Sequence, residues 1–222
     1  MSDQSKRSAS TRQATPVPRR TQAQRRAATI AKLVEATIEA IAEVGYHNAS
    51  LGEISRRAGV SKGGIFRHFD SRTDLVVAAA EEVGRRHMQA FDNLRQRENN
   101  DRPLDLTHIL HRGRNRIREE TNAVWFELLV AARTEPELRA RLAPVARALI
   151  DDVESVAIAA LTPLVPAEVA RLLATSMAHM FDGEAIFRVT YPRPELEDAR
   201  IEYIAEVFRQ LTGASTGVET SS

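Results

Sequence analysis

The sequence predicts an all-α protein, and three observations support this fold class. Apolar residues recur at helical spacing through most of the chain. No segment alternates with period two for long enough to indicate a strand, and short stretches rich in glycine, proline and polar residues separate the periodic segments. With 222 residues, of which 43% are hydrophobic, the chain can bury one large core or two small ones. We expect about nine helices.

The composition excludes several classes of protein. Cysteine is absent, which rules out disulfides, thiol catalysis and cysteine-bound zinc and makes the reducing cytoplasm the expected location. No run approaches the roughly 20 apolar residues that a membrane helix needs, and no secretory signal is recognisable at the N-terminus. We therefore expect a soluble, cytoplasmic protein without a membrane partner.

The N-terminal segment is strongly basic, although the net charge of the whole chain is only +1. Residues 1–26 contain seven Lys and Arg residues against Asp3 alone, so they carry +6 and the rest of the chain −5. Residues 1–20 lack apolar periodicity and are expected to form a disordered arm. A basic arm indicates a polyanionic partner, although a solubilising tail would have the same composition.

Local signals place the first helices. Thr21 and Gln24 form a capping box that begins a long amphipathic helix, which ends at Gly45. Ser50 and Glu53 form a second capping box before a helix of about two turns.

Three more signals complete this part of the chain. Gly59 ends the second helix and supplies the positive φ of a tight turn. Ser61 caps another short helix, and Ser71 begins a longer one. Four helices thus fill residues 21–97, with the spacing of a helix-turn-helix over about residues 50–69.

Helical periodicity continues beyond Pro103. We predict helices at 104–118, 123–132, 136–161, 169–190 and 195–211, and a frayed tail at 213–222. The predicted domains are the arm (1–20), a head with three helices that contains the helix-turn-helix (21–84), and a helical body (85–212).

The third helix has the composition of a recognition helix. Lys62 can reach a guanine edge or a phosphate, while Gly63 and Gly64 let the backbone approach DNA closely. Arg72 is placed for a phosphate, whereas Arg57 can equally be a solvated charge. The predicted DNA contacts are Ser50, Arg56, Arg57, Ser61, Lys62, Gly63, Gly64, Phe66, Arg67, His68, Arg72, Arg25 and Arg26.

These residues resemble a known family. The first helix ending at Gly45 and Tyr46, the stretch ISRRAGVSKGGIFRHF and the closing Asp74 and Leu75 are similar to the N-terminal domain of TetR/AcrR transcriptional regulators. The resemblance implies a homodimer that represses its target, with the third helix in the major groove and a ligand pocket in the body. Family members commonly have tyrosine where Phe66 stands, so a phosphate contact through that hydroxyl is lost here.

The body offers two further candidate sites. Large apolar side chains suited to a ligand pocket, or simply to ordinary core packing, are Phe91, Ile109, Trp125, Phe126, Leu129, Met177 and Met180. By resemblance the last two helices pair with those of a second copy, through Phe181, Ile201, Ile204, Phe208 and Leu211. The expected partners are double-stranded operator DNA, a second copy of the chain and a small apolar or amphipathic ligand.

No catalytic, cofactor or metal site is expected. His108, His111 and His179 lack carboxylate or cysteine partners at ligand spacing, and no nucleophile motif or phosphate loop supports an enzyme. Two interpretations remain open. One is a repressor that binds a palindromic operator as a homodimer and is released by a small molecule. The other is a DNA-binding dimer without a small-molecule effector.

Overall fold

The structure is a computed structural model that describes residues 21–98, 106–162 and 165–212, and within these ranges it contains only helices. The predicted all-α class is therefore confirmed. The predicted arm and tail lie outside the described residues. The helices are α1 (Gln22–Val44), α2 (Leu51–Ala58), α3 (Lys62–Ile65), α4 (Arg72–Glu98), α5 (Leu106–Ile117), α6 (Glu120–Ala132), α7 (Pro136–Leu161), α8 (Ala167–Phe187) and α9 (Pro194–Thr212).

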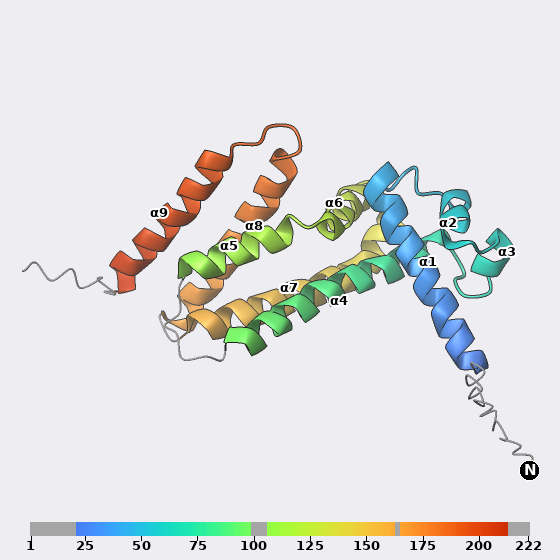
Figure 1. Cartoon of the computed structure of the whole chain (residues 1–222), viewed down its shortest axis with the longest axis horizontal. Coiled ribbons are helices and arrows are strands. Elements are labelled where there is room, and N and C mark those ends of the chain that lie inside the picture. The colour runs from blue at the N-terminus through green and yellow to red at the C-terminus, as the bar shows by residue number, and fades with distance from the viewer. Residues whose placement is uncertain (1–20, 99–105, 163–164, 213–222) are drawn as a thin grey trace, which may run out of the picture.

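The helices form an elongated molecule with a head at one end (Figure 1). Helices α1 to α3 make up the head, and α4 runs from the head along the body beside α7. At the far end α5 contacts both α8 and α9, while α6 packs against α1, α4 and α7. Thus α4 and α6 are the body helices that pack most extensively against the first helix of the head.

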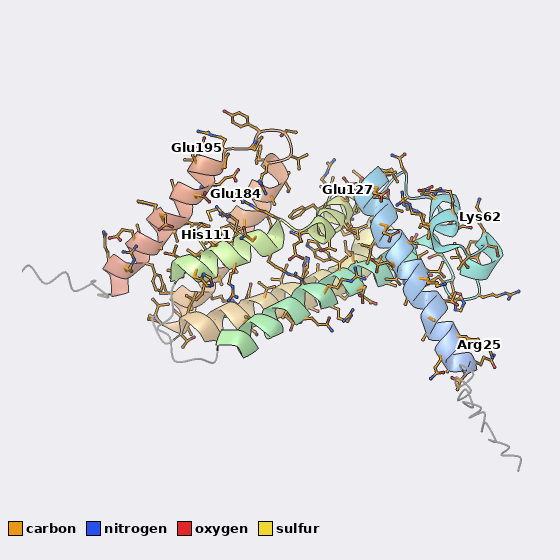
Figure 2. All side chains as sticks on the ribbon, in the orientation of Figure 1. Arg25, Lys62, His111, Glu127, Glu184 and Glu195 are labelled. Carbon is orange, nitrogen blue, oxygen red and sulfur yellow. The ribbon has the colours of Figure 1, made fainter. Side chains whose placement is uncertain are left out.

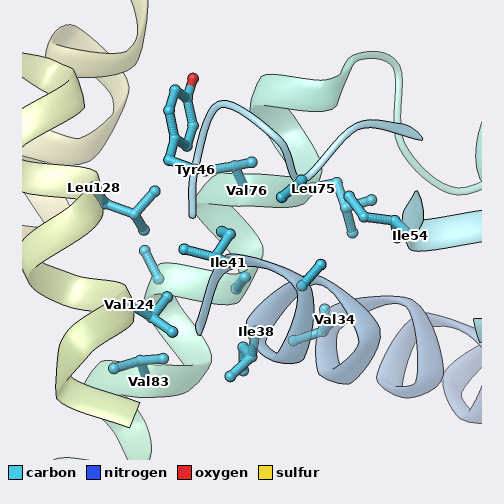
Figure 3. Packing of buried hydrophobic residues seen from close by; sticks show 14 of the residues in the cluster. Val34, Ile38, Ile41, Tyr46, Ile54, Leu75, Val76, Val83, Val124 and Leu128 are labelled. Atoms are coloured by element: carbon cyan, nitrogen blue, oxygen red, sulfur yellow. The ribbon is translucent and has the colours of Figure 1, made fainter. Parts of the chain in front are cut away.

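Head and body share one hydrophobic core. Ile41 of α1, Val83 of α4 and Leu128 of α6 are each fully buried and belong to one cluster, which continues to Leu138 and Leu142 of α7. Figure 3 shows the α1, α4 and α6 side chains meeting. The predicted domain boundary after residue 84 falls inside α4, so the head is joined to the body by a continuous helix as well as by this core.

The predicted capping boxes differ in outcome. Thr21 Oγ1 accepts a hydrogen bond from the Gln24 amide at 3.2 Å, and the Thr21 amide donates to Gln24 Oε1 at 2.9 Å, which confirms the first box. Ser50 Oγ accepts from the Glu53 amide at 3.2 Å, but Glu53 does not return the bond. Its carboxylate binds the side chain of Arg56 instead, because an ion pair outcompetes the neutral backbone donor.

Buried charges join the three helices of the far end. Arg118, directly after α5, donates to Glu184 of α8 and, at 2.7 Å, to Oε2 of Glu197 of α9. Arg200 of α9 donates to Glu184 Oε2 at 2.9 Å. Both carboxylates are buried, at 7% and 5% exposure, and the arginine side chains bound to them offset the cost of burying their charge. This network defines how α9 is positioned against α5 and α8.

Folding stability should fall as the pH is lowered from about 6.5 toward 4, because of His87. This α4 side chain is buried, and its Nε2 has no hydrogen-bond partner among the residues that the structure describes. Burial, and then the nearby charge of Arg116, lower the pKa of His87 from 6.5 to about 4. The unfolded chain therefore takes up a proton in this range and the folded chain does not. This difference lowers the free energy of unfolding by an amount on the order of 2–3 kcal/mol.

Urea unfolding at several pH values tests this expectation. His87→Leu should flatten the profile between pH 6.5 and 4.5, whereas His47→Gln, at an exposed position of the head, should not. The carboxyl group of Glu53, with a pKa of about 2, loses its contribution only at lower pH. A wild-type profile that is flat in this range would contradict the assignment.

Candidate DNA-binding surface

The helix-turn-helix is built on two buried isoleucines and one left-handed glycine. Ile54 of α2 and Ile65 of α3 are fully buried in the core. Between them Gly59 adopts φ 63° and ψ 30°, which confirms the predicted turn. The Ser55 hydroxyl donates to the Val60 carbonyl at 2.6 Å and closes the turn. The angle between α2 and α3 is thus determined by packing and by one backbone conformation.

Replacing Gly59 by alanine should destabilise the fold by about 1–2 kcal/mol, because a Cβ is unfavourable at positive φ. No atom lies within 4 Å of that Cβ, so the effect reports backbone strain alone. Gly63→Ala is the matched control: its Cβ also meets nothing, and its φ is not positive. Urea unfolding should show the loss for Gly59→Ala only, and equal stability of the two variants would contradict the argument.

The predicted recognition segment, residues 61–67, presents mainly small and polar groups at the surface. Helix α3 is one turn long, and the Ser61 hydroxyl caps it by accepting from the Gly64 amide at 3.1 Å. Phe66 follows in a turn and is 52% exposed, which is high for a phenylalanine. The predicted contacts that lie exposed in and beside α3 are Ser61, Lys62, Gly63, Phe66 and Arg67.

Lys62 lies over the start of α2 (Figure 2). A Cβ on Gly52 would be 3.6 Å from Cε and 3.7 Å from Nζ of Lys62, and 3.6 Å from Oγ of Ser50. The ammonium group therefore lies beside the N-terminal end of α2, which is itself partly positive. Gly52 thus makes room for Lys62, and the small size of residue 52 was the available signal for this role.

The two glycines of α3 have different roles. A Cβ on Gly63 would point into open space, as expected for an outer position where the lack of a side chain lets the backbone approach DNA closely. A Cβ on Gly64 would lie 2.8 Å from Cγ1 of Val60, so Gly64 is needed for packing within the helix-turn-helix. The prediction that both glycines face DNA is thus corrected for Gly64.

Arg57 was predicted as a DNA contact, but it binds within the head. Its side chain is 11% exposed and forms ion pairs of 2.7 Å with Glu43 of α1 and with Glu53. The bond to Glu43, followed by that to Glu53, raises the pKa of Arg57. Arg56 also pairs with Glu53, at 2.6 Å, but is 67% exposed and remains accessible. Arg57 joins α1 to α2, because its guanidinium group is bound by a carboxylate from each of these helices.

Arg72 was predicted to bind a phosphate, and this too is corrected. Its Nε donates to the carbonyl of Ala49 at 3.1 Å, and its Nη2 donates to the carbonyl of Tyr46. The guanidinium group also stacks 4.3 Å from the centroid of the Tyr46 ring. Arg72 therefore holds the loop between α1 and α2 against the start of α4.

The remaining predicted contacts differ in accessibility. His68 is half-buried, and its Nδ1 is buried without a hydrogen-bond partner within the described residues. Arg25 and Arg26 are exposed in the first turns of α1. Figure 2 shows Arg25 at the end of α1 away from Lys62, where the chain enters from residues 1–20. A contact by Arg25 would thus fall beside, and not inside, the surface formed by α2 and α3.

A helix-turn-helix with an exposed lysine and a glycine at its outer surface, held on a helical body, defines a DNA-binding transcription regulator. The sequence profile of the bacterial regulatory proteins of the tetR family matches residues 33–79. A helix-turn-helix transcriptional regulator of Mycobacterium tuberculosis, Rv2912c, is 41% identical over 183 residues, which are 82% of this chain and 93% of that protein. The chain belongs to the TetR family.

Solved structures share this fold. A putative TetR-family regulator from Mesorhizobium loti superposes with a TM-score of 0.68 at 18% identity, covering 84% of this chain and 98% of that one. The regulator FadR from Bacillus subtilis, solved in complex with stearoyl-CoA, gives a TM-score of 0.55 at 16% identity, covering 80% and 96%. The relatives and the family are transcription regulators and not enzymes.

The predicted pocket residues do not gather in one place. Trp125 and Phe126 pack in the core shared by head and body, whereas Met177 and Met180 pack in a separate cluster around Leu110. Of the other predicted residues, Leu129 is exposed, Ile109 is half-buried, and the side chain of Phe91 lies outside the described part. The prediction of one pocket from these residues is corrected, because large apolar side chains serve two separate cores.

The predicted dimer residues also need correction. Phe181, Ile201 and Phe208 are 4%, 0% and 6% exposed and are buried within their own chain. Ile204 is half-buried, and the side chain of Leu211 is not described. Helical periodicity identified the inner faces of the last two helices. The large apolar residues left exposed on α8, on α9 and between these two helices, here called the outer α8–α9 surface, are Val169, Leu172, Ile186, Phe187, Val189, Tyr191, Leu196 and Tyr203.

Two further classes of site were searched in the described ranges. Within them no helix has both the length and the apolar composition needed to cross a membrane. The same residues contain no group of three or more His, Cys, Asp or Glu side chains arranged to hold a metal ion. His111 instead contacts Arg114, with 3.0 Å between Nδ1 and Nη2.

Proposed function

We propose that the protein is a repressor that binds a palindromic operator as a homodimer and is released by a small molecule. The observation that carries the DNA-binding part is the exposed surface around Lys62, where an ammonium group and the N-terminal end of α2 lie together. Lys62 and the low surface at Gly63 suit the major groove, and Arg25 and Arg26 suit an adjacent phosphate backbone.

The outer α8–α9 surface supports the dimer. Val169, Leu172 and Ile186 follow one face of α8, together with Gly183, whose Cβ would meet nothing within 4 Å. A helix with exposed apolar residues and a glycine on one face permits close approach of a second copy. Such a self-complementary pairing is isologous, so the operator would contain two similar half-sites.

Tyr46 supports a path by which the body could act on the head. Its amide donates to Glu127 Oε2 of α6 at 3.0 Å, and its hydroxyl donates to Glu135 Oε2, just before α7, at 2.6 Å. Since Arg72 also binds its carbonyl, Tyr46 connects α6, α7 and α4 to the loop that precedes α2. A ligand that binds two arrangements of these helices with different affinity would move the heads.

Selection of DNA from a random pool by the full-length protein tests the proposal. We expect a palindrome whose half-sites are centred about one helical turn, or a multiple of it, apart. Enrichment of a single unrepeated site would contradict the homodimer, and no enrichment would contradict DNA binding. A compound that binds the body but leaves operator affinity unchanged would contradict release by ligand and favour a dimer without an effector.

A further inference from the structure

A groove of about 450 Å³ lies between α4 and α7, and none of the predicted pocket residues lines it. Its apolar wall is formed by Met88 of α4 with Val145 and Leu149 of α7. All three side chains are half-buried, so each leaves apolar surface accessible to a ligand. The methionine can adapt its shape to an apolar group.

The unpaired charges of the groove are negative. Glu81 of α4 and Asp152 of α7 line it and are exposed, and neither carboxylate has an ion pair or hydrogen bond in the described part of the chain. Arg85 also lines the groove, but its guanidinium group is bound to Glu82, with distances of 2.7 Å from Nε to Oε2 and 2.6 Å from Nη2 to Oε1. The positive charge of Arg85 is therefore offset locally, whereas the charges of Glu81 and Asp152 are not.

A proline interrupts the helical hydrogen bonding of α7 beside the groove. Pro144 lies inside α7 and lines the groove. Because proline has no amide hydrogen, the carbonyl of Ala140, one turn earlier, loses its helical donor. The unpaired charged groups that line the groove are the carboxylates of Glu81 and Asp152, which suit a ligand that brings hydrogen-bond donors and a positive charge.

We propose that the α4–α7 groove binds an amphipathic cation, with an ammonium or amidinium group between Glu81 and Asp152 and an apolar body against Met88, Val145 and Leu149. Helix α4 runs from this groove into the head, so such a compound would act on the position of the head. This second part, an effector role, rests on the proposed function.

Calorimetric titration of the full-length protein at pH 7 with a pair of probes tests the site. The probes are 2-naphthylmethylamine, which is protonated at this pH, and 2-naphthylacetate, which has a similar apolar body and the opposite charge. We expect the amine to bind with Kd on the order of 0.1–1 mM and the acetate at least about tenfold more weakly.

Variants locate the binding. The double variant Glu81→Gln and Asp152→Asn should weaken amine binding at least about tenfold, and Ala148→Trp should abolish it by filling the groove. The matched control is Asp151→Asn, an exposed carboxylate of α7 that does not line the groove, and it should bind the amine as the wild type does. No amine binding at millimolar concentration, equal binding of the acetate, or amine binding that survives these variants would overturn the site.

Operator affinity of the wild-type protein, measured with and without the amine, separates the two proposals. Weaker operator binding in the presence of the amine supports the effector role. Unchanged operator binding overturns that role while the calorimetric result still supports the groove. Absence of any operator binding overturns the proposed function and leaves the groove to be judged by calorimetry alone.

Discussion

Leu172→Glu should convert the proposed homodimer into monomers and weaken operator binding by about 100-fold or more, because two linked half-site contacts become independent. Leu172 is 68% exposed on the outer α8–α9 surface, so the carboxylate does not disturb the core of the chain. In a dimer the same carboxylate would be buried without a partner. Sedimentation at micromolar concentration and an operator titration measure the two effects.

The matched control for this variant is Val130→Glu. Val130 is likewise apolar and 64% exposed, but it lies on α6, outside the outer α8–α9 surface. This variant should remain dimeric and keep the wild-type operator affinity. If Leu172→Glu stayed dimeric, the interface would lie elsewhere, and if its monomers bound the operator with full affinity, the requirement for two half-sites would be wrong.

Lys62→Ala should weaken operator binding by about 10-fold or more, corresponding to roughly 1–3 kcal/mol for a contact to a base or phosphate. The side chain is exposed, so the free energy of unfolding should change little. If the ammonium group neutralises a phosphate, the slope of log affinity against log salt should also decrease by about one. Operator titrations at several salt concentrations measure both quantities.

Lys32→Ala serves as the control for charge alone. Lys32 is also an exposed lysine of the head, on α1, and it is not among the predicted DNA contacts. Its removal should change operator affinity by much less than the removal of Lys62. Equal losses for the two variants would mean that Lys62 acts only through the general charge of the head.

Much of the head could be predicted because its signals are local. The capping box of Thr21 and the left-handed turn at Gly59 depend on residues within one or two turns of each other. The position of Lys62 at the start of a short helix follows from Ser61 in the same way. Interactions of this range are determined by neighbouring residues, so the sequence reveals them before the fold is known.

The directions of the charged side chains could not be predicted in this way. Arg57 and Arg72 lie next to a basic recognition segment, and their type and spacing fit DNA contacts equally well. Their partners, Glu43 and the carbonyl of Tyr46, belong to α1 and the loop after it. Only the packing of α1 against α2 and α4 brings these acceptors within reach, so the inward orientation is a tertiary property.

The same distinction applies to the apolar residues of the body. Helical periodicity places Phe181 and Ile201 on apolar helix faces, and it does the same for Leu172 and Phe187. It does not show which of these two pairs the chain buries with its own helices. By itself, the sequence determined the helical class, the helix-turn-helix and the position of Lys62 at the start of a short helix. The tertiary structure decided which arginines face inward, which apolar surface is left exposed and where α4 and α7 enclose a groove, because burial depends on contacts between residues far apart in the chain.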